Sequence, residues 1–263
     1  MSGIEQRAED LQRLRGFRLM DDDFMSKCFE DNIPCTELVL SIVLGRDDLK
    51  VESVRTQYAI ANLQGRSVRL DVFATDEKGK HYNIEIQRAD RGAGAKRARY
   101  NSSLMDANLL DSGTEWEQLP ETYVIFITER DVLGSKLPIY HVDRTIAETG
   151  VSFADEAHII YVNGECKDDT PLGILMSDFH CTDPDDMKYD VLADRVRYFK
   201  ENEKGVAAMC KAMEDMREET RLAERRAIAR KMVKKGALPL EEIAEYADLP
   251  LSEIEEMART KSA

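Results

Sequence analysis

The sequence predicts an α/β protein in which a mixed β-sheet is flanked by helices and followed by a helical C-terminal extension. Strand-like runs rich in apolar and β-branched residues lie at 68–73, 82–86, 121–128 and 157–163. The third of these runs is almost continuously apolar, as expected for a central buried strand. Helical patterns precede, separate and follow the strands, which is the arrangement of a sheet with helices on its faces.

Three helices are expected before the first strand. Residues 5–16 predict a short exposed helix of mixed charge. Residues 21–23 form an acidic N-cap cluster that begins the next helix. The almost wholly apolar run that follows predicts a buried helix, with Thr36 as its N-cap and Gly45 at its C-terminal end.

The later helices include one between the strands and several in the C-terminal extension. They are predicted at 93–110, 171–179, 184–201 and 205–235. Asp183 is placed to cap the third of these helices, and Gly236 to end the fourth. The last segment, LPLEEIAEYADLPLSEIEEMART, has the layout of a helix-turn-helix, but its second helix is rich in glutamate, which a DNA groove would repel. We therefore expect it to serve in packing or oligomerisation.

The most informative stretch, VRLDVFATDEKGKHYNIEIQ, predicts a β-hairpin with two acids side by side. The sequence DEKGK supplies the turn, and Gly79 can adopt a positive φ there. If the turn centres on Lys78, Asp71 lies directly opposite Glu85. Opposed Cβ atoms are about 4.5–5.5 Å apart, so the two carboxylates could share one hard cation. The alternative is a pair of acids on an exposed hairpin without a function.

Composition describes a globular protein without a membrane segment. Hydrophobic residues make up 43% and charged residues 33% of the 263 positions. No run approaches the roughly 20 apolar residues of a membrane helix, and the N-terminus lacks the apolar core of a signal peptide. We therefore expect a cytoplasmic protein with no membrane partner. The five cysteines and four histidines show no zinc-binding spacing, so reduced thiols are expected.

Basic residues are concentrated in two segments although the formal net charge is −14. Residues 88–99 contain five basic residues and one acid, directly after the candidate acid pair. Residues 217–235 contain eight basic residues and three acids, with arginines at 217, 221 and 225 on one helix stripe. Each segment is either a solvated face or a contact surface. The position of the first suits a phosphodiester substrate.

The spacing of Asp71 and then Glu85-Ile86-Gln87 resembles the metal-binding core of PD-(D/E)XK nucleases, with Gln87 where many members carry lysine. Further segments narrow the resemblance to the transposase, recombination-promoting branch: IEIQ with RADRGAGAKRARYNSSLMDANLL, ETYVIFITERDVLG, PIYHVDRT and DDTPLGILMSDFHC. The likeness covers roughly residues 17–235. It implies a restriction-endonuclease-like core at 17–202, between a helical extension at 1–16 and a long basic helix with a short appendage at 203–263.

The resemblance also implies a Mg²⁺- or Mn²⁺-dependent DNA endonuclease. Asp71 and Glu85 would hold the metal with the backbone carbonyl of Ile86. Glu37, on the first core helix, is a third candidate ligand, and the alternative is that it complements the helix dipole. Gln87 carries no charge and cannot act as a general base, so its expected role is to orient water.

DNA phosphates are expected to contact the basic segment that follows the acid pair. The residues concerned are Arg88, Lys96, Arg97, Arg99 and Tyr100. The alternative function is a catalytically inactive nuclease fold that serves as a DNA- or protein-interaction module. In either case the C-terminal helices are the candidate surface for a homo-oligomer.

Overall fold

The computed structural model describes residues 3–62, 65–88 and 92–259. The chain divides into two compact units. The core unit comprises residues 11–206, and the terminal unit joins residues 1–10 to residues 207–263. The predicted domain boundaries at residues 17 and 203 remain predictions, and the first ten residues group with the C-terminal segment.

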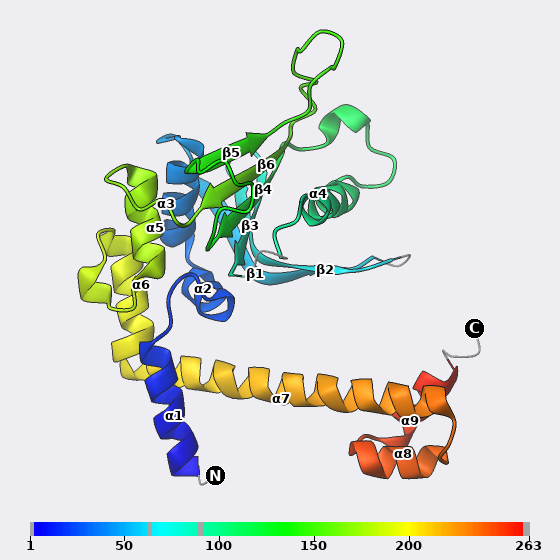
Figure 1. Cartoon of the computed structure of the whole chain (residues 1–263). Coiled ribbons are helices and arrows are strands. Elements are labelled where there is room, and N and C mark those ends of the chain that lie inside the picture. Colours follow the sequence, from blue (N-terminus) through cyan, green and yellow to red (C-terminus); the bar gives the residue numbers. More distant parts are fainter. Residues whose placement is uncertain (1–2, 63–64, 89–91, 260–263) are drawn as a thin grey trace. The chain divides into compact units, whose positions relative to one another are not determined.

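The core unit contains a six-stranded mixed sheet in the order β1-β2-β3-β4-β6-β5 (Figure 1). Its strands are β1 (Val51–Ile60), β2 (Val68–Asp76), β3 (His81–Gln87), β4 (Thr122–Thr128), β5 (Ile139–Val142) and β6 (Ala157–Asn163). β1, β2 and β3 form an antiparallel meander, β3, β4 and β6 are parallel, and β5 pairs antiparallel with β6. Helices flank this sheet, so the predicted fold class is confirmed.

The sequence did not predict the two edge strands, β1 and β5. β1 lacks a regular alternation of buried and exposed residues, and its pairing with β2 is irregular between Val51 and Ser53. β5 has four residues, none of them buried. The alternation of buried and exposed residues that identifies a strand is therefore absent from β1, and β5 is too short for it to be recognised.

The predicted register of the β2–β3 hairpin is confirmed. Val72 pairs with Ile84 and Thr75 with His81, as expected for a turn centred on Lys78. Gly79 has a φ of 77°. The Asp76 side chain stabilises the turn because its Oδ1 accepts hydrogen bonds from two backbone N–H groups of the turn, each at 2.9 Å.

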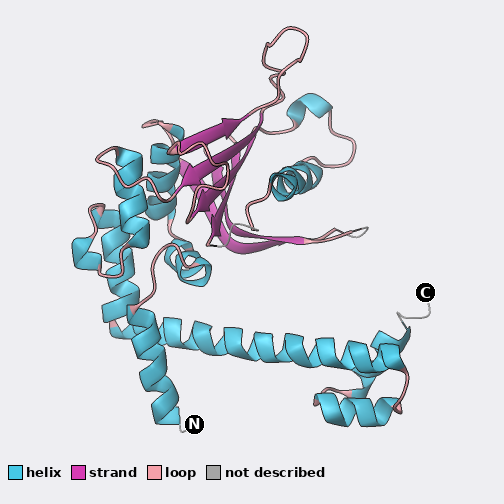
Figure 2. Cartoon of the chain, viewed as in Figure 1, coloured by secondary structure: helices cyan, strands magenta, loops and turns pink. Residues whose placement is uncertain are grey.

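Helices cover both faces of the sheet (Figure 2). α4 (Ala95–Leu109) packs on one face, against β4 and β6. α2 (Asp22–Phe29) and α3 (Ile33–Leu44) lie against the other face, and α5 (Pro171–His180) and α6 (Asp190–Glu201) pack outside them. This arrangement leaves the carboxyl ends of the parallel strands β3 and β4 at one edge of the layered core.

Two predicted helix starts are wrong. α3 begins at Ile33 because the Asn32 side chain caps it by accepting a hydrogen bond from the N–H of Cys35 at 3.1 Å. Thr36 lies inside the helix, and its hydroxyl donates back to the Asn32 carbonyl. Residues 184–186 form a separate 3-10 turn capped by Asp183, and α6 begins only at Asp190.

The terminal unit contains the main part of α7 (Glu203–Lys235), with α8 (Leu240–Ala247) and α9 (Leu251–Arg259). Ala229 and Val233 of α7 form a buried cluster with Ile243, Leu249 and Ile254, so the last segment packs on α7. The first helix, α1 (Gly3–Arg15), is divided between the units: its residues up to Asp10 belong to the terminal unit, and the rest belong to the core unit.

The arginine stripe on α7 is paired with acids of the terminal unit. Arg217 makes a two-pronged ion pair with Asp10 at 2.7 and 3.0 Å. The other two arginines, at 221 and 225, pair with Glu218 and Asp248. These pairs favour internal ion pairing over a free phosphate-binding stripe. No described helix is both long enough and apolar enough to span a bilayer.

Candidate metal site and basic groove

Asp71 and Glu85 meet where β2 parts from β3. The registered pairs of the hairpin end at Val72 and Ile84. Beyond them the Asp71 Oδ2 accepts a hydrogen bond from the Ile86 N–H at 3.0 Å, in place of a strand carbonyl. The Asp71 N–H in turn donates to the Glu85 carboxylate. Each acid is thus fixed against the backbone beside the other.

Glu85 is fully buried, and two side chains hold its carboxylate. The Asn83 amide donates to Oε1 at 3.1 Å, and Arg97 Nη2 donates to Oε2 at 2.7 Å. Arg97 comes from α4, where its Nη1 also donates to the Gly92 carbonyl and its guanidinium lies 5.8 Å from the Phe126 ring centroid. The position of Glu85 therefore depends on α4 as well as on β3.

Burial makes the acid pair costly to ionise. Removal from water raises the pKa of Asp71 to about 7, and the neighbouring Glu85 charge adds to this effect. Asp22, at the start of α2, raises it further, whereas the Ile86 N–H and Arg97 lower it. The pKa of Glu85 is also raised, mainly by burial, against the opposing effect of Arg97. A bound cation would relieve this cost.

The donor set at this point suits a small hard cation. Because the Ile86 N–H faces β2, its carbonyl faces the same way, beyond the last registered pair. Two carboxylates and one carbonyl are oxygen ligands, and Mg²⁺ is often held by one or two carboxylates together with water and substrate phosphate. Within the described ranges no group of three or more His, Cys, Asp or Glu side chains could hold a metal ion. The chain therefore offers a partial ligand shell.

Glu37 lies apart from this pair. Its carboxylate accepts hydrogen bonds from Lys50 Nζ and from the Val51 N–H, each at 2.9 Å. Val51 pairs with Asp76, five residues along β2 from Asp71, which corresponds to about 17 Å at 3.4 Å per residue. The expectation of a third ligand at Glu37 is therefore corrected, because this carboxylate joins α3 to the start of β1.

Gln87 is half-buried at the end of β3, on the same face as Glu85 because strand side chains alternate. It pairs with Thr128 in the parallel ladder, and its carbonyl accepts the N–H of Glu129 at 3.0 Å. The amide of Gln87 is thus placed at the strand end beyond Glu85.

A basic groove lies between α4 and the start of β2. Its cavity volume is about 900 Å³, and its lining includes five basic side chains and no acid among the described residues: Arg66, Arg69, Lys96, Arg97 and Arg99. Tyr100 also lines it, and its hydroxyl donates to the Arg66 carbonyl. Four of the predicted phosphate contacts, at 96, 97, 99 and 100, are therefore brought together.

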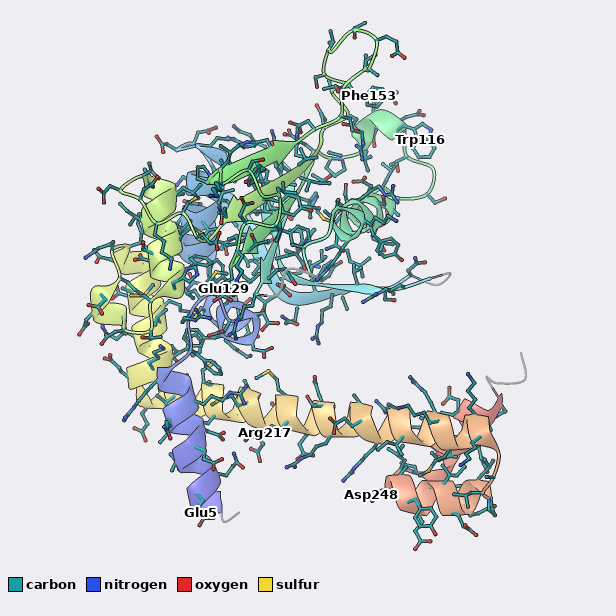
Figure 3. The ribbon with its side chains drawn as sticks, viewed as in Figure 1. Glu5, Trp116, Glu129, Phe153, Arg217 and Asp248 are labelled. Atoms are coloured by element: carbon teal, nitrogen blue, oxygen red, sulfur yellow. The ribbon has the colours of Figure 1, made fainter. Side chains whose placement is uncertain are left out.

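Arg88 belongs to a different cluster. It pairs with Asp21 at 2.8 Å and contacts Glu129 at 3.7 Å. Glu129 directly follows β4 and lies at the end of the sheet near α2 (Figure 3), and it also pairs with Arg18. Arg91, which contributed to the basic count of the sequence, lies outside the described residues.

Sequence reasoning missed Arg66, Arg69 and Asp22. The two arginines were overlooked because charges were counted along continuous runs, whereas the fold places β2 opposite α4. Asp22 was interpreted as part of a helix cap. The signal for Arg69 was its position on the strand that carries Asp71, and Arg66 lies two residues before that strand.

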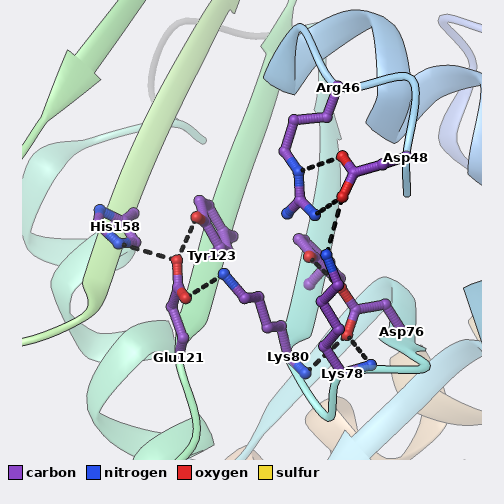
Figure 4. Close-up of polar contacts among 9 residues, drawn as sticks. Arg46, Asp48, Asp76, Lys78, Lys80, Glu121, Tyr123 and His158 are labelled. Carbon is purple, nitrogen blue, oxygen red and sulfur yellow. Dashed lines mark hydrogen bonds and ion pairs between the residues drawn. The ribbon is translucent and has the colours of Figure 1, made fainter. Parts of the chain in front are cut away.

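The opposite end of the sheet contains a separate ion-pair network (Figure 4). Glu121 accepts from Lys80 and from Tyr123, and it lies 3.4 Å from His158 Nε2. A second group joins Arg46 to Asp48 through two hydrogen bonds of 3.1 Å each. These charges are matched by partners and support the strand ends.

The family model described as "PD-(D/E)XK nuclease family transposase" matches residues 40–165. This range contains the acid pair, Gln87 and the groove. No curated protein and no solved structure matches the chain. The family match supports a nuclease or transposase function.

Proposed function

Because residues 40–165 match the model of the PD-(D/E)XK nuclease family transposases, we propose that the chain is a Mg²⁺- or Mn²⁺-dependent DNA endonuclease of the recombination-promoting type. The observation that carries this proposal is the juxtaposition of the half-buried Asp71 carboxylate and the fully buried Glu85 carboxylate at one sheet end. A groove lined by basic side chains shares Arg97 with that pair. An acid pair beside a basic groove is suited to a phosphodiester substrate.

Each residue has a distinct role in this proposal. Asp71, Glu85 and the Ile86 carbonyl would hold the metal ion. The ion, when bound, supplies charge stabilisation at the phosphate and lowers the pKa of a coordinated water. Gln87 orients water through its amide, since it has no basic group. Arg97 holds the Glu85 carboxylate and offsets its charge.

The groove residues position the strand for hydrolysis of a phosphodiester bond. Lys96 and Arg99 are exposed on α4, and the Tyr100 hydroxyl is fixed between Asn62 and the Arg66 carbonyl. In this role the basic side chains neutralise phosphate charge. A homo-oligomer formed through α7, α8 and α9 also remains a proposal, and light scattering of the full chain tests it.

A second candidate is a nuclease fold without catalysis that binds DNA or a protein. Two observations favour it: Gln87 stands where many relatives carry lysine, and the described residues provide no third acidic or imidazole ligand. In that case the groove and the acid pair would serve binding alone.

A plasmid-nicking assay with Mg²⁺ or Mn²⁺ separates the two functions. We expect cleavage by the wild type and its loss in Asp71→Asn and Glu85→Gln. Glu37→Gln is the matched control, because it also removes one carboxylate but lies away from the pair. Equal cleavage by all four proteins would reject the assigned site, and the absence of wild-type cleavage with either metal would favour the binding module.

A further inference from the structure

The basic groove has four cationic side chains without a salt bridge among the described residues, although Arg69 also interacts electrostatically with Asp23. Arg66, Arg69, Lys96 and Arg99 are exposed, and none has an ion-pair partner among the residues that the structure describes. Arg97, the fifth, is paired with Glu85. In a chain of net charge −14, such a concave patch attracts anions by focusing positive potential.

The two walls of this groove are held a fixed distance apart. Lys96 and Arg99 lie on α4, whereas Arg69 lies at the start of β2 and Arg66 just before that strand. Tyr100 bridges the walls, since its ring is carried by α4 and its hydroxyl donates to the Arg66 carbonyl. The Asn62 amide donates to the same hydroxyl at 3.1 Å. The gap at this point is therefore no wider than the reach of one tyrosine side chain.

The width of the gap between the two walls favours single-stranded over double-stranded DNA. One groove of a DNA duplex is already about 12 Å wide, so a whole duplex is too broad to enter between the walls. The cavity volume of about 900 Å³ lies within the range of about 300–1,000 Å³ that encloses a single small ligand. A short segment of one strand, with its phosphates between two basic walls, fits this space.

We propose that the groove binds a short segment of single-stranded DNA through its phosphates, with Arg66 and Arg69 on one wall and Lys96 and Arg99 on the other. The proposal rests on the proposed function only for the delivery of that strand to Asp71 and Glu85. Binding itself requires neither the metal nor the acid pair. The two ideas can therefore fail separately.

The test measures binding of single-stranded DNA to the full chain in the presence of a chelator. The readout is the fluorescence anisotropy of a labelled oligothymidylate of eight nucleotides. Four phosphate contacts on a single strand predict a slope of about −2.8 for the logarithm of affinity against the logarithm of salt. The affinity should then fall about 50-fold between 50 and 200 mM salt. A hairpin duplex with an eight-base-pair stem should bind at least about tenfold more weakly, equivalent to about 1.4 kcal/mol.

Variants assign the binding to the groove. In Arg66→Ala/Arg69→Ala we expect the slope to fall to about −1.4, since two contacts are lost. Lys167→Ala/Lys188→Ala is the control, because it removes two exposed positive charges elsewhere in the core unit and should keep the wild-type slope. Circular dichroism verifies that both variants are folded.

Three results would overturn the proposal: no strand binding by the wild type at low salt, an unchanged slope in Arg66→Ala/Arg69→Ala, or equal binding of the duplex. Asp71→Asn separates this proposal from the catalytic one. If this variant and the wild type bind the strand equally but the wild type cleaves nothing, the groove stands and the endonuclease fails. If the wild type cleaves DNA while the groove variant keeps full affinity and slope, the endonuclease stands and the groove assignment fails.

Discussion

Replacing Arg97 with alanine should destabilise the metal-free protein by about 2 kcal/mol. The variant leaves Glu85, which is 0% exposed, without the guanidinium that now lies 2.7 Å from its Oε2. Loss of one partner from a fully buried ion pair costs about 3–5 kcal/mol. Because the Arg97 side chain is 42% exposed, solvent screening reduces this by roughly half.

The loss should depend on pH in a defined direction. Without Arg97 the pKa of Glu85 rises further above its ordinary value, because the group that lowers it is removed. The folded variant then retains a proton at a pH where the unfolded chain has released it, so its free energy of unfolding falls as pH rises. The difference from the wild type should be largest near pH 8 and small near pH 5.

Urea unfolding followed by far-ultraviolet circular dichroism measures this difference, with chelator and with saturating Mn²⁺. We expect Mn²⁺ to reduce the difference in unfolding free energy between variant and wild type to less than about 1 kcal/mol, because a cation beside Glu85 replaces the missing positive charge. A ligand at 100 times its dissociation constant stabilises the folded state by about 2.7 kcal/mol. Arg99→Ala, on the same helix, is the control and should change stability by less than about 0.5 kcal/mol. If Arg97→Ala lost less than about 0.5 kcal/mol, or if Mn²⁺ left the difference from the wild type unchanged, Arg97 would not be the group that stabilises the buried Glu85 charge.

Three further outcomes are expected. Mn²⁺ affinity should fall about tenfold per pH unit below about 7, the pKa of Asp71. Calorimetry in buffers of different ionisation enthalpy should detect the release of about one proton when Mn²⁺ binds at pH 6. Mn²⁺ binding that does not depend on pH would contradict the raised pKa of Asp71. Glu37→Gln should keep wild-type Mn²⁺ affinity but lose about 1 kcal/mol of stability, since it breaks the contacts with Lys50 and Val51; weakened Mn²⁺ binding would restore Glu37 as a ligand. Gln87→Ala should lower kcat by about tenfold with Mn²⁺ affinity unchanged, as for a residue that only orients water, and an unaltered kcat would remove Gln87 from the site.

The central part of the fold was predictable because its physical signals are local. The hairpin register followed from one turn with Gly79, and it placed Asp71 opposite Glu85 before any tertiary contact was considered. β4 was recognisable because a central strand is apolar on both faces. β1 was not recognisable, because in this irregular edge strand buried and exposed residues do not alternate regularly.

The site was only partly predictable because it depends on which elements pack together. Arg97 and Arg99 were found from a basic run next to the acid pair, whereas Arg66 and Arg69 join them only because the fold brings residues 66–69 opposite α4 across the groove. Glu37 shows the opposite error, since an acid on the first core helix suggested a ligand until Lys50 and Val51 were seen to hold it. Sequence spacing locates residues within an element, but tertiary packing decides their partners.

The central claim is that Asp71 and Glu85 share one divalent cation. Anomalous scattering from a crystal of the protein soaked in Mn²⁺ tests it most directly. We expect a single peak within about 2.3 Å of a carboxylate oxygen of each acid, with the Ile86 carbonyl at a similar distance. A peak at other residues, or none between these two carboxylates at a Mn²⁺ concentration that supports DNA cleavage, would contradict it.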